Sequence, residues 1–219
     1  TCNVLWYRLS AFLFHGWFAE LRLNPHTAFV AYEKCLYNKA VVVNLVILLL
    51  LLVALFFSIP YLRSGTKFGA PYVPLDRKVV ERVMKLGKVG SGAKFYDLGS
   101  GDGRLVIAAA RRGANAVGVE IDGIRVWYSR LWARLYKLKN ATFIKGDLFA
   151  QDLSDADVVS VFLLEKTNEK LRPKLARELK PGTLVIASGF KIPDWKPIKT
   201  DLHGPRNGPI YVYQINSKH

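Results

Sequence analysis

The sequence is poor in cysteine and histidine, the side chains that most often bind metals or form cross-links. Its two cysteines, Cys2 and Cys35, both lie near the start of the chain, and its four histidines are scattered. Disulfide frameworks and cysteine-based metal sites need several such residues at short, regular spacings. The sequence therefore predicts neither a disulfide framework nor a metal site.

Acidic residues are also scarce, with 17 Asp and Glu against 32 Lys and Arg, which gives a net charge of +15. A basic chain favours anionic partners such as nucleic acid or an acidic lipid surface. The alternative is a lysine-rich surface that serves only solubility. The 219 residues are enough for one α/β domain and an appendage.

Charge is missing altogether from residues 40–60, AVVVNLVILLLLLVALFFSIP, which Lys39 and Arg63 bracket. A helix over this run would measure about 30 Å, the thickness of the hydrocarbon core of a bilayer. A helix buried in a soluble domain would need a polar face, whereas this run offers only Asn44 and Ser58. The sequence therefore predicts a transmembrane helix over residues 40–61.

The flanking charges predict the orientation of this helix. Residues 20–39 carry three Lys or Arg and residues 62–88 carry seven, and the more basic side usually stays in the cytosol. We expect the C-terminal domain on the cytosolic side, or on the matrix side of a mitochondrial membrane. The aromatic residues 1–39 predict an interfacial leader, the alternative being a disordered or targeting leader. Residues 62–75, which contain Pro71-Tyr72-Val73-Pro74, predict an extended linker.

A glycine-rich turn follows an apolar strand in the stretch Phe95-Tyr96-Asp97-Leu98-Gly99-Ser100-Gly101-Asp102-Gly103-Arg104. Glycines let backbone N–H groups approach a ligand closely, because no Cβ stands in the way. The turn lacks the third glycine of a dinucleotide fingerprint, since that position is Arg104. Its Asp-x-Gly-x-Gly-x-Gly form resembles motif I of class I S-adenosylmethionine (SAM) methyltransferases. The resemblance implies that Asp97, Gly99, Ser100, Gly101, Asp102 and Gly103 bind SAM, the alternative being a turn that serves packing alone.

Two further acids follow predicted strands. Glu120 ends the expected strand 116–120 and precedes Ile121, and an acid at the end of the second strand of a βαβ unit is placed to bind ribose hydroxyls. Asp147 and Leu148 follow the expected strand 141–145. In the family that the turn resembles, an acid after the third strand binds the adenine amino group. The alternative for Asp147 is a plain turn aspartate.

The pattern of apolar runs predicts the fold of residues 76–219. Expected helices over 76–86, 105–112, 123–138 and 169–179 alternate with expected strands, of which 158–164 is a continuous apolar run typical of a central parallel strand. A last strand over 210–215 would pair antiparallel after a turn. We therefore expect an α/β fold with a doubly wound, mostly parallel seven-stranded sheet, the Rossmann-like fold of methyltransferases.

Several stretches together are similar to a narrower family. Pro71-Tyr72-Val73-Pro74, the glycine turn, Val126-Trp127-Tyr128-Ser129-Arg130, Leu179-Lys180-Pro181-Gly182 and Phe190-Lys191-Ile192-Pro193-Asp194-Trp195 resemble the protein-lysine methyltransferases of the adenine nucleotide translocase and the ATP synthase c subunit, and their archaeal and bacterial relatives. Archaeal members have Thr where this chain has Glu165. The chain also lacks the Asn/Asp-Pro-Pro-Tyr loop that methylates bases, and this absence counts against nucleic acid as the acceptor. The acceptor-channel candidates are Tyr72, Glu165, Asn168, Phe190 and Trp195, each of which could instead serve packing or cap the surface.

The resemblance implies a membrane-anchored, SAM-dependent protein-lysine N-methyltransferase whose partners are a protein substrate with a target lysine and membrane lipid. Methyl transfer from a sulfonium is an in-line displacement, so the enzyme mainly positions the acceptor. A lysine acceptor, with an ordinary pKa of about 10.4, must first lose its proton. The alternatives are a lipid or small-molecule N-methyltransferase and a binding module without turnover.

Overall fold

The computed structural model describes residues 25–62, 73–202 and 208–216. The chain forms two compact units, Thr1–Ser58 and Ile59–His219, and each is described by itself. Residues 1–24 of the predicted leader 1–39 and residues 63–72 of the predicted linker 62–75 lie outside the described ranges. Residues 25–39, predicted as part of the leader, instead form the first part of a helix.

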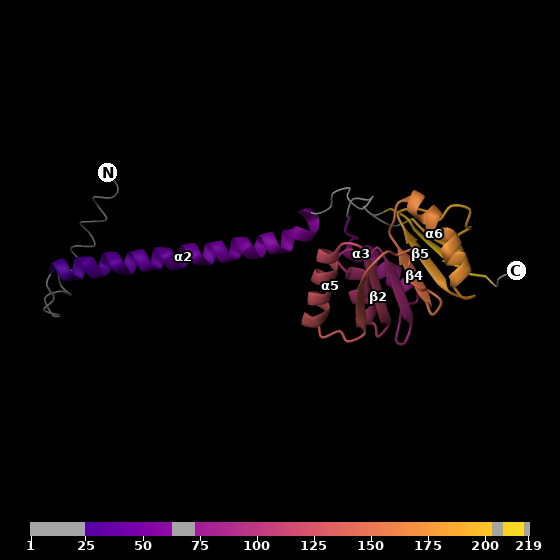
Figure 1. Ribbon diagram of the computed structural model, residues 1–219, viewed down its shortest axis with the longest axis horizontal. Helices are drawn as coiled ribbons and strands as arrows, with labels where there is room; N and C mark the ends of the chain where they lie inside the picture. The colour runs from indigo at the N-terminus through magenta and orange to yellow at the C-terminus, as the bar shows by residue number, and fades with distance from the viewer. Residues whose placement is uncertain (1–24, 63–72, 203–207, 217–219) are drawn as a thin grey trace. The chain divides into compact units, whose positions relative to one another are not determined.

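The described part of the first unit is one helix, α2, whose full extent is Pro25–Leu62 (Figure 1). The predicted helix over residues 40–61 is therefore present, but it is only the second part of a longer helix whose first part includes Glu33, Lys34 and Lys39. The apolar side chains of residues 41–53 are exposed. By length and hydropathy, no helix within the described ranges qualifies to cross a membrane. The structure thus supports the helix and does not support the predicted membrane span.

The second unit is built on a seven-stranded sheet with the order β3-β2-β1-β4-β5-β7-β6. The strands from β1 to β5 are parallel, and β7 pairs antiparallel with β5 and with β6. The predicted doubly wound, mostly parallel seven-stranded sheet is confirmed as a mixed sheet. Its strands are β1 (Lys94–Leu98), β2 (Asn115–Glu120), β3 (Ala141–Lys145), β4 (Val158–Val161), β5 (Leu184–Ser188), β6 (Lys199–Asp201) and β7 (Ile210–Gln214).

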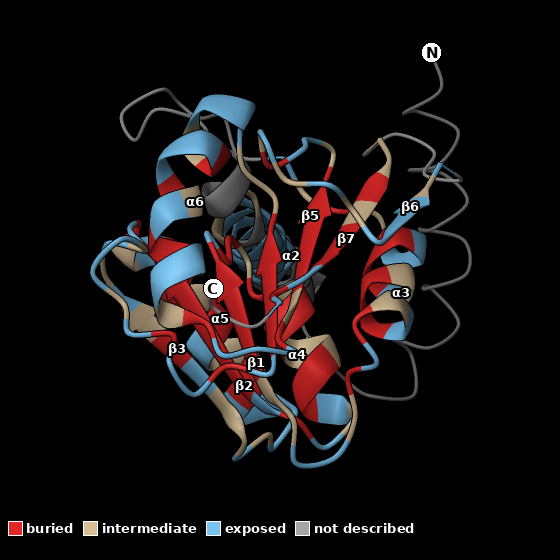
Figure 2. Cartoon of the chain, turned by 90° about the vertical axis from the view of Figure 1, so that its right-hand side faces the viewer, coloured by how far each residue is buried: buried red, intermediate tan, exposed pale blue. Residues whose placement is uncertain are grey.

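Helices cover both faces of this sheet. Successive side chains of a strand point to opposite faces, so neighbouring residues of β1 pack against different helices. Phe95 of β1 packs in the cluster that contains the buried side chains of α3 (Arg77–Leu86), α4 (Arg104–Arg111) and α5 (Gly123–Leu135). Its neighbour Tyr96 packs in the other cluster, with those of α6 (Glu165–Glu178). Figure 2 shows the buried strands between these helices, whose outer faces are exposed. The domain therefore has two apolar cores, one on each face.

Three predicted boundaries are wrong. The helix α5 ends at Leu135 instead of 138, and Lys137 then takes a left-handed φ of 56°. The strand β4 ends at Val161 instead of 164, because its pairing with β1 and β5 stops there. The helix α6 begins at Glu165 instead of 169, since the Leu164 carbonyl already accepts the N–H of Asn168.

The strand order places the functional site. The strand β1 lies between β2 and β4, so the chain crosses over both β2 and β1 on its way from β3 to β4. Open α/β sheets bind ligands outside the carboxyl ends of the strands at such a switch point. The loops after β1, β2 and β4 meet there.

Candidate functional site: a cofactor cradle at the sheet edge

The loop after β1 is held against β2 by its own backbone. The N–H groups of Gly99 and Ser100 both donate to the Val119 carbonyl, at 2.9 and 3.0 Å. Gly99, Gly101 and Gly103 have φ values of 83°, 55° and 78°. These are left-handed conformations, which side chains with a Cβ resist. The alternating glycines therefore permit a loop shape that few other residues could adopt.

Gly103 is also required by packing. A Cβ at this position would lie 2.6 Å from Cε1 of Phe143 and 2.8 Å from Oγ of Ser129. Phe143 belongs to β3 and Ser129 to α5, and both are buried. The bare backbone at Gly103 thus lets the start of α4 approach α5 and β3.

Glu120 joins the glycine loop to the start of α5. The residue is only 6% exposed at the carboxyl end of β2. Its Oε2 accepts the Gly101 N–H at 2.8 Å, and its Oε1 accepts the Asp122 N–H at 2.9 Å. Asp122 in turn caps α5, because its side chain accepts the Ile124 N–H at 2.9 Å. The Glu120 carboxylate is therefore fixed by two backbone donors.

Asp97 is a second buried acid at this site. We call the glycine loop 99–103, together with Asp97 and Glu120, the cradle. Burial, together with the nearby charges of Asp102 and Glu120, raises the pKa of Asp97 to about 8. Asp102 itself accepts from the Arg104 Nε at 2.9 Å. Three carboxyl groups thus converge at the glycine loop. These acceptors fit a cationic ligand that carries hydroxyl groups, such as SAM.

The turn after β3 lies beside Glu120. The Gly146 N–H donates to the Glu120 carbonyl at 3.0 Å. Asp147 is exposed, and its Oδ1 accepts the Phe149 N–H at 2.9 Å. Ile121 is 47% exposed and Leu148 half-buried. The structure therefore brings the predicted adenine and ribose residues to the same edge, and their contacts with SAM stay a prediction.

The loop after β5 is tied to α6 by one buried amide. Asn168 is 1% exposed, and its Nδ2 donates to the carbonyls of Phe190 at 3.4 Å and Lys191 at 3.1 Å. The Phe190 side chain is 40% exposed, and Glu165 is exposed at the start of α6. Among the predicted acceptor residues, the structure thus brings Asn168 and Phe190 together. Asn168 supports the loop and is too buried to meet a large acceptor.

Trp195 takes part in packing. Its ring meets the Tyr213 ring edge-on at 5.8 Å, and the Tyr213 hydroxyl accepts the Ile192 N–H at 3.0 Å. Tyr72 lies outside the described ranges. The sequence does not single out Leu163, whose Cδ2 would lie 3.0 Å from a Cβ on Gly99. The apolar run 158–164 predicts that Leu163 lies within a strand. Because β4 ends at Val161, Leu163 instead lies in the loop that follows, next to Gly99.

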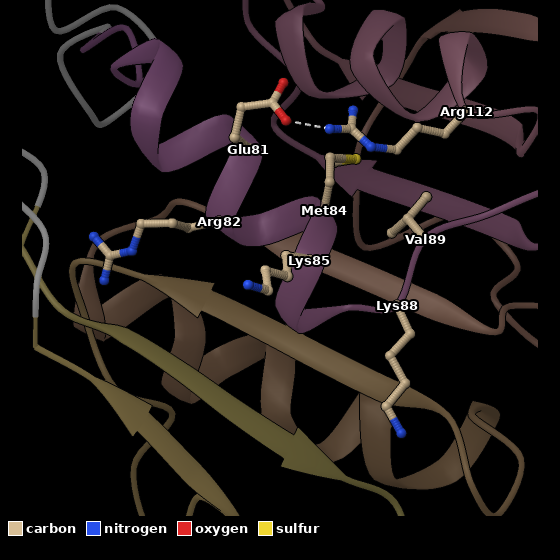
Figure 3. Close-up of a pocket in the computed structure, with 7 residues that line it drawn as sticks. All are labelled: Glu81, Arg82, Met84, Lys85, Lys88, Val89 and Arg112. Atoms are coloured by element: carbon tan, nitrogen blue, oxygen red, sulfur yellow. Dashed lines mark hydrogen bonds and ion pairs between the residues drawn. The ribbon is translucent and has the colours of Figure 1, made fainter.

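A separate pocket lies away from this cradle, between α3 and the end of α4. Figure 3 shows the ion pair of Glu81 with Arg112, with the side chains of Lys85 and Lys88 directed away from it. Arg82, also in its lining, donates through Nε to Asp201 at 2.8 Å. The pocket contains no residue of the glycine loop and no end of β1 or β2. Within the described ranges, no group of acids, histidines and cysteines forms a metal site.

The fold and the cradle together define a SAM-dependent methyltransferase. A family model described as the ANTKMT methyltransferase domain matches residues 97–199. A protein-lysine N-methyltransferase of Saccharolobus islandicus is 43% identical over 153 residues, which cover 66% of this chain and 93% of that protein. The chain belongs to this methyltransferase family and uses SAM as its cofactor.

Other relatives show how far the likeness extends. The human lysine N-methyltransferase of the ATP synthase c subunit is 40% identical over 142 residues, 64% of this chain and 59% of that protein. A crystal structure of an RNA methyltransferase from Salinibacter ruber with S-adenosyl-L-homocysteine is 40% identical, with a TM-score of 0.63. It matches over 67% of this chain and 96% of that one. The similarity therefore spans nearly whole prokaryotic relatives, but little more than half of the human protein.

Proposed function

We propose that this chain is a SAM-dependent protein-lysine N-methyltransferase. The observation that carries the proposal is its 43% identity to an archaeal protein-lysine N-methyltransferase over 93% of that protein. The residues that the family model matches, 97–199, include the glycine loop and the two buried acids, Asp97 and Glu120. Curated relatives from animals also carry lysine N-methyltransferase names.

The residues of the cradle have separable tasks in this proposal. SAM, when bound, supplies an electrophilic methyl group on a sulfonium. The Glu120 carboxylate is placed to accept hydroxyl groups, and the acids around Asp97 favour a ligand with positive charge. The backbone of the glycine loop lets that ligand lie close without steric conflict.

On the acceptor side, exposed apolar side chains after β4 and β5 favour a neutral amine. Leu164 is 38% exposed and Phe190 is 40% exposed, and they follow β4 and β5 at the edge where the cradle opens. A lysine amine that enters between apolar groups loses solvation, which lowers its pKa and favours the uncharged nucleophile. Asn168 holds the Phe190 backbone in place for this contact.

The test is transfer of radiolabelled methyl groups from SAM to proteins in a lysate. We expect labelled protein bands whose acid hydrolysates contain methylated lysine. Gly101→Arg should abolish the label, because it places a long side chain on the loop at a left-handed φ of 55°. Label that persists in this variant would contradict the cofactor assignment.

A second candidate acceptor is RNA, because a 40% identical solved structure is named an RNA methyltransferase. The net charge of +15 also suits a nucleic-acid partner. A lipid or small molecule is the third possibility. Nuclease-sensitive label would favour RNA, and label extracted by organic solvent would favour a lipid, whereas lysine methylation predicts neither.

We also propose that α2 anchors the chain to a membrane, with the catalytic domain on the cytosolic side or, in a mitochondrion, on the matrix side. The support is the uncharged run of residues 40–60 within a helix, together with seven Lys and Arg in residues 62–88. Carbonate extraction of membranes tests the anchor, and protease protection of the domain tests its side. Release of the full chain by carbonate would contradict the anchor.

A further inference from the structure

The helix α5 has an apolar stripe on the side that faces away from the core. Ile124, Trp127, Leu131 and Leu135 recur at intervals of three and four residues, so they share one side of the helix. The residues that α5 buries are Arg125, Val126, Ser129 and Ala133, and the helical repeat places them on the opposite side. We call the first four residues the α5 stripe.

The α5 stripe is open to solvent. Ile124 is 37%, Trp127 52% and Leu135 61% exposed, while Leu131 is half-buried. A helix that packs on a sheet normally presents polar groups on this side. Contiguous exposed apolar side chains on a domain usually mark a docking surface.

Every charge on the segment that carries the stripe is positive. No Asp or Glu occurs in residues 123–146, which carry six Lys and Arg. Arg134, Lys137 and Lys139 are exposed beside the C-terminal end of the stripe. Arg111 of α4 extends this basic surface, because its guanidinium lies 4.1 Å from the centroid of the Tyr136 ring.

We propose that the α5 stripe docks the catalytic domain on an anionic lipid bilayer. Tryptophan and leucine insert at the boundary between head groups and acyl chains, while arginine and lysine contact the acidic head groups. The absence of acids from residues 123–146 matches such a surface. The proposal is independent of the acceptor and of the anchoring role of α2.

The chemistry of the stripe disfavours two other occupants. A second copy of the chain would bring two basic surfaces together without an acid to pair them. A nucleic acid would suit the cations and stack on Trp127, but it offers nothing to Ile124 or Leu135. Both occupants are outcomes of the experiment below.

The experiment uses the full chain in nanodiscs that contain nitroxide-labelled lipid. The fluorescence difference between the wild type and Trp127→Phe isolates the signal of Trp127. We expect lipid to quench this signal in discs with phosphatidylglycerol and much less in pure phosphatidylcholine. Arg134→Gln with Lys139→Gln should weaken docking by about fivefold for each cation removed.

A matched pair of variants compares the loss of an exposed apolar side chain in the α5 stripe with the same loss elsewhere on the domain. Leu135 and Ile198 are both 61% exposed, but Ile198 lies outside α5. Leu135→Glu should abolish the quenching of Trp127, and Ile198→Glu should preserve it, with SAM binding unchanged in both. Quenching that is absent in anionic discs, or that survives Leu135→Glu, overturns the proposal. Protection of Trp127 by RNA alone, or by dimerisation in lipid-free detergent, overturns it as well.

Discussion

Glu120→Gln tests the cradle most sharply, because the change keeps the size of the side chain and removes its charge. In the structure both carboxylate oxygens accept backbone N–H groups, from Gly101 at 2.8 Å and Asp122 at 2.9 Å. The amide can accept only through its oxygen, so its NH₂ group would face the N–H of Gly101 or Asp122. The variant therefore loses one buried charge-assisted hydrogen bond and a favourable site for ribose hydroxyls.

The magnitude for SAM follows from the contact that Glu120 is proposed to make with the ribose. A hydrogen bond to a charged group contributes about 1.5–3 kcal/mol, so the loss of the bond from a ribose hydroxyl to the carboxylate should raise the Kd for SAM by about 10- to 100-fold. The loss of the Glu120 charge also removes one of the causes that raise the pKa of Asp97. The pKa of Asp97 should therefore fall in the variant, which partly offsets the loss of stability.

Isothermal titration calorimetry with SAM measures the affinity. Glu169→Gln is the matched control, because Glu169 is exposed on α6 and its charge lies outside the cradle. We expect the control to bind as the wild type does. A Glu120→Gln protein that is folded and binds SAM within about twofold of the wild type would refute the role of this carboxylate.

Three further predictions concern single residues of the site. Folding raises the pKa of Asp97 from 3.8 to about 8, so between these values the folded state binds a proton that the unfolded state has lost. The free energy of unfolding should therefore fall by on the order of 5 kcal/mol as the pH rises from 4 to 8. Urea unfolding should show this fall in the wild type and not in Asp97→Asn. Gly103→Ala should cost about 2–5 kcal/mol, because it adds a steric conflict to a left-handed φ, whereas Gly182→Ala, at a φ of 91° with nothing within 4 Å, should cost only about 1–2 kcal/mol; equal costs in thermal unfolding would exclude the packing argument. Asn168→Ala should destabilise by about 1–3 kcal/mol and raise the KM for the acceptor, with the Kd for SAM unchanged; steady-state kinetics that show the reverse would remove its positioning role.

The shape of the glycine loop could be predicted because its determinants are local in the sequence, whereas its contacts with SAM stay a prediction. Alternate glycines at 99, 101 and 103 admit left-handed backbone, and the structure has all three in that conformation. The position of Glu120 beside the glycine loop could be predicted because this residue ends an apolar strand. The parallel sheet follows from the alternation of apolar runs with amphipathic helices. In each case a short stretch contains both the pattern and its cause.

The acceptor half depends on contacts between distant residues, which spacing alone does not reveal. Glu165-Lys166-Thr167-Asn168 has no apolar residue, so nothing in it predicts the first turn of α6. The role of Asn168 depends on carbonyls 22 and 23 residues later in the chain. Trp195 packs against the ring of Tyr213, which lies far from it in the sequence, and its place in an acceptor channel stays a prediction. The prediction of a membrane span rests on the uncharged run alone, and the structure supports only the helix there.

The most direct test of lysine methylation is mass spectrometry of proteins after reaction with SAM and the purified chain. The account predicts a gain of whole methyl groups on lysine side chains of an acceptor protein, lost in Glu120→Gln at SAM concentrations well below the Kd of the variant. A methylated nucleotide or lipid in place of methylated lysine would contradict it, as would an absence of any SAM-dependent gain in mass.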